Sequence, residues 1–206
     1  MSWRLASRLA VLISAILVII VVLVVTHGNS NGQPSSALQG TDLGGVNAPN
    51  FQLTDQFGKP VSLAQFRGHP VVLTFLYTHC PDYCPLIADK IHLGLSKLGS
   101  ASANVGVIAV STDPANDDIN AAYQFSQTHH MLNEWHFLIG SQAQLSPIWS
   151  EYGVAAQAAP TAAPSGPVDH TLAVYLIDKQ GHERVYLGQD FDPSALAKDL
   201  QTLLKS

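Results

Sequence analysis

The stretch from Val71 to Asp89 constrains the fold more than any other part of this chain. It opens with a strongly apolar run, Val71 to Tyr77, which is typical of a central strand in a sheet covered on both faces. Pro85 to Leu98 then carries apolar side chains at helical spacing, and Pro85 suits the first helical position. The pattern predicts a strand, a turn and a helix start, an arrangement on which α/β proteins commonly build their sites.

The turn between these elements holds the only two cysteines of the 206 residues, Cys80 and Cys84. We place Cys84 at or near the helix N-cap and Cys80 just before it. A helix N-terminus favours negative charge, so we expect a lowered thiol pKa there, opposed locally by Asp82. Two thiols at this spacing can close a disulfide or chelate a metal. A purely structural disulfide would close a short loop and add little chain-entropy stabilisation.

The rest of the folded part alternates strands and helices, which predicts an α/β sandwich with a mixed central sheet. A hairpin is expected first, and a second hairpin and a helix capped by Asp192 close the fold. An Ala/Pro-rich loop, 155–168, precedes the last hairpin. The expected strands are 51–63 (a hairpin), 71–77, 105–110, 135–139, 171–177 and 182–187, and the expected helices are 85–98, 117–129, 141–152 and 195–204.

The N-terminal region carries an apolar run, Leu9 to Val25, that is long enough to span about 25 Å as a helix. Arg4 and Arg8 precede it, so the positive-inside rule predicts a cytoplasmic N-terminus and an extracytoplasmic domain. A cleaved signal peptide is the alternative. We therefore expect three parts: a membrane anchor at 1–27, a flexible Gly/Ser/Asn-rich linker at 28–46, and one folded domain at 47–206. The formal net charge of −5 and the absence of a basic patch exclude general nucleic-acid binding.

A metal site built on two thiolates would prefer Cu(I), and would hold Zn(II) less exclusively. It needs at least one further donor, and the chain has nine histidines. Most lie where an ordinary structural role is expected; His129 and His130, for example, end a helix, where a cation favours the helix dipole. His170 differs, because it joins the Ala/Pro-rich loop to a strand expected beside the cysteine strand. Spacing alone leaves its role open.

Three motifs in order give a more specific indication. The first is Phe75-x-Tyr77-Thr78-x-Cys80-Pro81-Asp82-x-Cys84-Pro85. The second is Val110-Ser111-x-Asp113-Pro114. The third is Val168-Asp169-His170-Thr171, followed by Leu176-Ile177-Asp178-x-x-Gly181. Together they resemble the Sco/SenC family of copper chaperones over Phe51 to Lys205.

The resemblance implies a thioredoxin-like fold, an N-terminal membrane anchor and an extracytoplasmic domain. It also implies that Cys80, Cys84 and His170 bind Cu(I) or Cu(II), that Cys80 and Cys84 form a disulfide when oxidised, and that Asp169 supports the ligand histidine from outside the ligand set. The implied role is assembly of the binuclear copper centre of cytochrome c oxidase subunit II. The implied partners are therefore subunit II and, through the N-terminal anchor, the membrane. Another periplasmic or extracytoplasmic copper donor is left open.

Two other functions use the same cysteines. A thiol–disulfide oxidoreductase that reduces the subunit II cysteines needs Cys80 and Cys84 but not His170, so the chain is expected to be a metallochaperone with thiol–disulfide reductase activity left open. A peroxidase of the same fold would need a Thr-x-x-Cys motif. Thr78 lies two residues before Cys80 instead of three, which argues against it.

Overall fold

The structure is a computed structural model and describes residues 38–155 and 173–206. These residues belong to one compact unit that begins at Ala37. No helix within the described ranges is long and apolar enough to cross a bilayer. The expected membrane span at Leu9 to Val25 lies outside those ranges, as does most of the Ala/Pro-rich loop.

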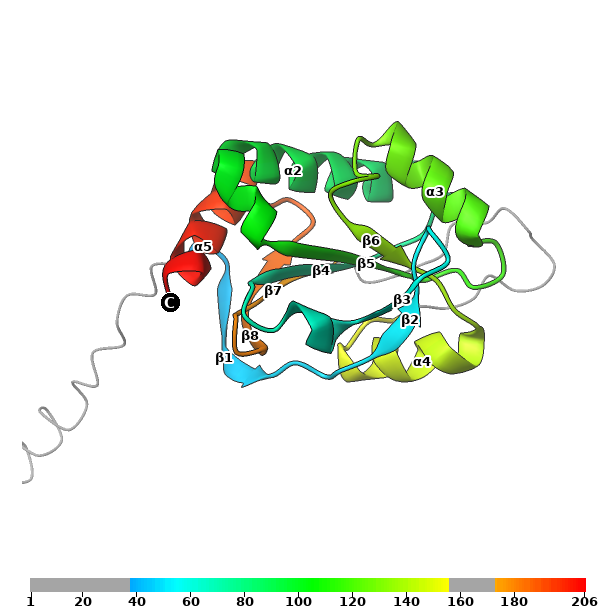
Figure 1. The fold of residues 1–206 in the computed structure, drawn as a ribbon, viewed down its shortest axis with the longest axis horizontal. Helices are drawn as coiled ribbons and strands as arrows, with labels where there is room; N and C mark the ends of the chain where they lie inside the picture. The colour runs from blue at the N-terminus through cyan, green and yellow to red at the C-terminus, as the bar shows by residue number, and fades with distance from the viewer. Residues whose placement is uncertain (1–37, 156–172) are drawn as a thin grey trace, which may run out of the picture. The chain divides into compact units, whose positions relative to one another are not determined.

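A six-stranded mixed sheet forms the centre of the domain, in the order β1-β8-β7-β4-β5-β6 (Figure 1). β4 pairs parallel with β5, and β5 parallel with β6, whereas β7, β8 and β1 add antiparallel pairs. A separate two-stranded hairpin joins β2 to β3. The strands are β1 (Thr41–Asn47), β2 (Gln52–Thr54), β3 (Pro60–Ser62), β4 (Val71–Leu76), β5 (Gly106–Ser111), β6 (His136–Leu138), β7 (Ala173–Ile177) and β8 (His182–Gly188).

Helices cover both faces of the sheet, with α2, α3 and α5 on one face and α4 on the other (Figure 1). β4 and β5 are buried along their whole length because they lie between these two layers. The α-helices are α2 (Tyr83–Leu98), α3 (Ile119–Thr128), α4 (Gln142–Glu151) and α5 (Pro193–Lys205), and two 3-10 helices cover Leu63–Phe66 and Gly99–Asn104.

The alternation of residues along β4 divides the core into two clusters. Val72 and Leu76 pack toward α2 and α5, in the same cluster as Ile91 and Leu200. Leu73 and Phe75 face the opposite side, where α4 and the β2–β3 hairpin cover them. This confirms the expected α/β sandwich with a mixed sheet, because a strand apolar on both faces requires a covering layer on each.

Three helices begin at capping residues, and the expected cap at Asp192 is confirmed. Asp118 begins α3 and accepts a hydrogen bond from Ala121 N–H, and Ser141 begins α4 with a capping box. Asp192 begins α5 and accepts from Ser194 N–H, with Pro193 in the first turn. Carboxylate and hydroxyl oxygens at these positions satisfy backbone N–H groups that have no partner within the helix.

The expected linker at 28–46 is wrong over its last residues, because Thr41–Asn47 forms strand β1 along the free edge of β8. The two N–H groups of Gln39 and Gly40 donate to the carboxylate of Asp199, at 2.5 and 3.1 Å. Leu38 is buried in the core cluster that contains α5. The folded domain therefore includes residues that composition had assigned to a linker.

Candidate metal centre

The two cysteines lie at the carboxyl end of β4, in the turn that leads into α2. Cys80 is half-buried, whereas Cys84, in the first turn of α2, is fully buried. The backbone N–H of Cys84 donates to Cys80 Sγ at 3.3 Å, so the two residues are brought together across the turn. No disulfide joins Cys80 to Cys84 in this structure.

The helix begins two residues earlier than the sequence predicted. α2 starts at Tyr83 with Asp82 at the N-cap, so Cys84 is the second helical residue instead of the N-cap and Pro85 is the third. The missing N–H of Pro85 is still tolerated there, because the first N–H groups of a helix have no internal partner.

The predicted lowering of the thiol pKa is wrong for Cys84. Burial raises the pKa of the Cys84 thiol far above its usual range, and its hydrogen bond with Cys80 raises it further. The free-energy cost of removing a thiolate from water exceeds the stabilisation that the helix N-terminus provides. Cys84 is therefore a thiol in the metal-free protein, and a metal ion would have to displace its proton.

A buried carboxylate holds the backbone just before Cys80. Asp117 Oδ1 accepts from the N–H of Thr78 at 2.9 Å and from Thr78 Oγ1 at 2.6 Å. Its Oδ2 accepts from Ser111 Oγ at 2.5 Å. Burial raises the pKa of Asp117, and the hydrogen bonds from Ser111 and Thr78 oppose that shift. Asp117 thus ties the end of β5 to the cysteine turn.

Sequence reasoning placed Asp117 at a helix start and missed this contact. The available signal was its position three residues after Asp113-Pro114, in the turn that follows the strand paired with β4. Parallel neighbours bring their carboxyl ends to the same edge of a sheet, so the turns after β4 and β5 were bound to meet.

A cavity of about 590 Å³ lies beside Cys80. One side is formed by the cysteine turn, including His79, and the other by α3 and its ends, including Phe125 and His129. Thr78 Oγ1 lies 2.9 Å from His79 Nδ1, and His129 Nδ1 lies 3.0 Å from Asp89 Oδ1. Two imidazoles therefore border the space next to the half-buried thiol.

Several other histidines pair with carboxylates or carbonyls away from the cysteines. His136 Nδ1 lies 2.9 Å from Asp55 Oδ2, and His182 Nδ1 lies 3.4 Å from Asp178 Oδ2. His69 Nδ1 contacts the carbonyl of Asn104. Their ordinary structural roles were expected.

His170 and Asp169 lie outside the described residues. The strand that follows them is described, and it confirms one expectation: β7 lies directly beside β4. Within the described ranges, no group of three or more His, Cys, Asp or Glu side chains is arranged to hold a metal ion. The thiol pair is thus a partial ligand set.

Comparison with known proteins gives a consistent result. The family model for SCO1/SenC matches residues 41–205. The SCO2 homologue of Homo sapiens, a mitochondrial protein, is 31% identical over 149 residues, which cover 70% of this chain and 54% of that protein. The mouse SCO2 homologue is 30% identical over 161 residues, or 76% of this chain and 62% of that protein. The chain thus matches little more than half the length of these curated relatives.

Solved structures support the same relationship. Bradyrhizobium japonicum ScoI, with copper bound, has a TM-score of 0.69 and 31% identity, covering 77% of this chain and 99% of that one. Apo Sco1 from Thermus thermophilus has a TM-score of 0.71 and 30% identity, covering 81% of this chain and 97% of that one. The first of these structures holds copper and the second does not.

Proposed function

The chain belongs to the SCO1/SenC family, and we propose that it is a metallochaperone that carries copper during assembly of cytochrome c oxidase. The cargo ion would be held by Cys80, Cys84 and His170, with Asp169 supporting the imidazole. The receiving protein would be subunit II, where the binuclear copper centre is built. The observation that carries the proposal is the thiol pair at the end of β4, at the sheet edge where β7 begins.

Sheet register supports the inclusion of His170. Thr74 pairs with Val174, and Thr74 Oγ1 donates to the carbonyl of Ala173 at 3.0 Å. Because β4 and β7 run antiparallel, the start of β7 lies at the end of β4 that leads to the cysteines. Position 170 precedes Ala173 by three residues, a separation of at most about 11 Å along the chain. A chain segment of that length is short enough to let position 170 approach the thiol end of the sheet.

The chemistry of the donors suits a transferable copper ion. Two thiolates and one imidazole are soft to borderline ligands, which favour Cu(I). The exposed fraction differs between the thiols, because Cys84 is buried while Cys80 borders the cavity. An acceptor's ligands would approach through that cavity and exchange first at Cys80.

Membrane attachment and topology are part of the proposal. Residues 1–27 would anchor the chain through Leu9 to Val25, with the N-terminus in the cytoplasm and the domain outside. A linker from residue 28 to about residue 37 would let the domain reorient toward its partner. A copper donor outside the cytoplasm would supply the ion.

A substitution that removes only the imidazole tests the proposed function. In the full chain, His170→Ala should weaken Cu(I) affinity by at least roughly tenfold, since even residues that only support a ligand contribute about 10–100-fold. Affinity is measured by competition with a chromogenic Cu(I) chelator. His182→Ala, which removes a histidine paired with Asp178, is the matched control and should leave affinity unchanged. Undiminished Cu(I) affinity in His170→Ala would show that the ligand set is wrong.

A second function, thiol–disulfide exchange with the subunit II cysteines, is favoured by the closeness of the two cysteines across the turn and by their unequal burial. In such a pair the accessible thiol, Cys80, would attack the substrate disulfide and Cys84 would resolve the mixed disulfide. Reduction of insulin disulfides by the reduced full chain measures this activity. It should require both cysteines and be unaffected by His170→Ala, which separates it from copper binding.

A further inference from the structure

A cluster of imidazole and carboxylate groups lies where α2 meets the end of α3 and the loop before β6. His92 Nδ1, from α2, lies 2.9 Å from Glu134 Oε2 in that loop. The ring of His130, just after α3, is centred 5.9 Å from the ring of His92. The side chains of His92 and Glu134 are each 32% exposed, and His130 is exposed, so ions in solution can reach all three.

His130 has an unusual backbone for a residue with a side chain. Its φ is 59°, and it is the one non-glycine residue with positive φ within the described ranges. His129 is the C-cap of α3, so His130 occupies the next position, where glycine is usual because it has no Cβ to strain. Ending the helix does not require an imidazole. Residues in strained backbone conformations cluster at functional sites, so the side chain of His130 is a candidate for a role of its own.

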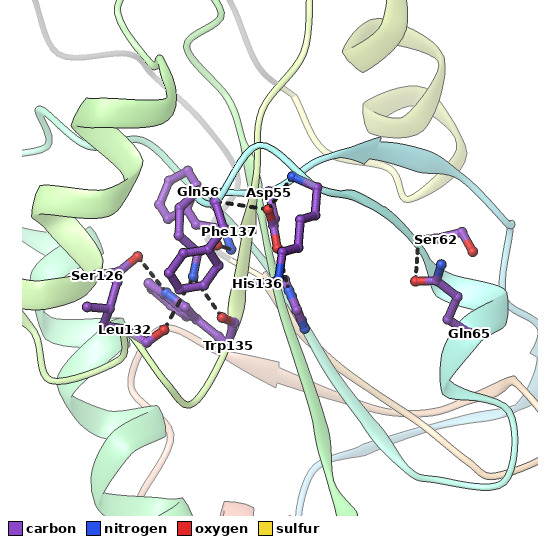
Figure 2. A network of polar contacts seen from close by, with 11 residues as sticks. Asp55, Gln56, Ser62, Gln65, Ser126, Leu132, Trp135, His136 and Phe137 are labelled. Atoms are coloured by element: carbon purple, nitrogen blue, oxygen red, sulfur yellow. Dashed lines mark hydrogen bonds and ion pairs between the residues drawn. The ribbon is translucent and has the colours of Figure 1, made fainter.

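The loop that carries Glu134 is held firmly. Its N–H donates to Met131 O at 2.9 Å. The buried side chain of Gln56 donates to the carbonyls of Leu132 and Trp135 (Figure 2). Leu132 lies two residues before Glu134 and Trp135 one residue after it. Trp135 Nε1 also donates to Ser126 Oγ at 2.8 Å. The carboxylate is therefore presented to His92 from a fixed backbone.

We propose that His92, His130 and Glu134 form a second metal site, separate from the cysteines, for a divalent transition-metal ion such as Zn(II). Imidazole and carboxylate are suitable ligands for such an ion. Donors at about 2.0–2.1 Å from one ion lie roughly 3 Å apart, and two imidazoles on one ion have ring centres about 5–6 Å apart. The first separation agrees with the 2.9 Å between His92 Nδ1 and Glu134 Oε2, and the 5.9 Å between the two rings is near the upper end of the second before the ring of His130 rotates.

The third ligand has to move to complete the site, because no three such side chains within the described ranges already surround an ion. His130 is exposed and can rotate its ring toward the His92–Glu134 pair. Water would fill the fourth position. His129, which precedes His130, borders the Cys80 cavity instead and pairs with Asp89.

Zn(II) titration of a background without the proposed copper ligands tests this site. The full chain, made without a histidine tag, carries Cys80→Ser, Cys84→Ser and His170→Ala, and Zn(II) binding is followed by isothermal titration calorimetry. We expect one Zn(II) with a Kd in the micromolar range. Adding His92→Ala or His130→Gly should each weaken binding at least roughly tenfold. Adding His182→Ala, whose imidazole also faces a carboxylate, should not.

His130→Gly supplies a second measurement that a purely structural role would not produce. Glycine accepts the positive φ without strain, so the variant should melt at a higher temperature than its parent while binding Zn(II) more weakly. Absence of micromolar Zn(II) binding in the background, or unchanged binding in His92→Ala and His130→Gly, would overturn the proposal. Either result leaves the proposed copper function untouched, because the background lacks those ligands.

Discussion

Asp117 shows how one buried residue can position the cysteine turn without touching a thiol. Its carboxylate accepts from the backbone and hydroxyl of Thr78 and from the hydroxyl of Ser111. All three donors would lose their partner if the carboxylate were removed. A buried donor without a partner costs about 1–3 kcal/mol.

The Asp117→Ala substitution should therefore lower the free energy of unfolding by about 2–4 kcal/mol, measured by urea denaturation at pH 7. Asp117→Asn keeps an acceptor for Thr78 and should lower the free energy of unfolding by less.

The raised pKa of Asp117 fixes the pH dependence of its contribution to stability. That contribution is greatest below the ordinary value of 3.8 and falls as pH rises through the higher folded value. The Asn variant should thus gain stability relative to wild type between pH 4 and pH 7. Equal effects of Ala and Asn would contradict this account.

The two cysteines should differ in reactivity because their surroundings differ. Cys84 is fully buried and burial raises its pKa, whereas Cys80 borders the cavity. In the reduced, metal-free chain at pH 7.5, iodoacetamide should modify Cys80 at least roughly tenfold faster than Cys84. Peptide mass spectrometry measures the two rates, and unfolding in urea should make them similar. Faster modification of Cys84 in the folded chain would contradict the structure.

At this scale the sequence predicted where the two cysteines lie in the fold and misjudged the environment of Cys84. C-x3-C, followed by Pro85, located both thiols and the helix that follows. The pKa direction of Cys84 was wrong because burial depends on how the domain packs over the first turn of α2, which local spacing does not reveal. Asp117 was missed for the same reason, since its partner Thr78 lies 39 residues away.

At the scale of elements, β1 is a strand whose formation depends on pairing with the neighbouring strand β8. Its sequence, Thr41–Asn47, contains two adjacent glycines at positive φ, and its pairing with β8 shifts register between Asp42 and Val46. No alternating apolar pattern indicates a strand here. It forms because β8 has an open edge and because Asp199 of α5 fixes the preceding backbone.

Removing the Asp199 carboxylate should release this strand. Asp199→Ala leaves the N–H groups of Gln39 and Gly40 without their acceptor, at an expected cost of about 1–3 kcal/mol. Backbone amides of β1 should exchange with deuterium faster, while those of the central strand β4 keep their protection relative to global stability. Mass spectrometry of peptides from the exchanged chain distinguishes the two. Unchanged exchange in β1 would show that other contacts hold it.

Most elements were predictable from sequence, including the short strands β2, β3 and β6, whereas the edge strand β1 was not. The helices α3, α4 and α5 begin within two residues of their predicted starts, where Asp118, Ser141 and Asp192 cap the first turn. Such caps are local interactions, so the sequence alone can predict them. The pairing of β1 with β8 joins residues far apart in sequence, so it could not.

At the scale of the whole domain, two buried aspartates pair with histidines, one between segments that are distant in sequence and one within a single hairpin. Asp55, in the β2–β3 turn, reaches His136 of the edge strand β6 (Figure 2). Asp178, in the β7–β8 turn, accepts from the N–H of His182 and contacts Arg184. Burial alone would raise the pKa of both aspartates, but their hydrogen bonds outweigh it and lower the pKa of each.

These lowered values predict a loss of stability in acid. A group with a lowered folded pKa contributes fully above its ordinary value, 3.8 here, and loses that contribution as pH falls through the folded value. The contribution of each of these two aspartates to the free energy of unfolding, which is measured with urea, should therefore drop as pH falls through its folded pKa, and comparing a variant with wild type isolates that contribution from those of other acids. Asp55→Asn should be less stable than wild type at pH 7, and the difference should shrink in acid. A difference that grows in acid would contradict the assigned direction.

The central claim is that two sulfurs and one imidazole hold a single copper ion at the carboxyl end of β4. The most direct test is extended X-ray absorption fine-structure spectroscopy of the full chain loaded with one equivalent of Cu(I). The chain carries His92→Ala, which removes the proposed second metal site. The account predicts two sulfur scatterers and one imidazole nitrogen, with the nitrogen lost in His170→Ala. An unchanged nitrogen shell in His170→Ala, or a first shell without two sulfurs, would contradict it.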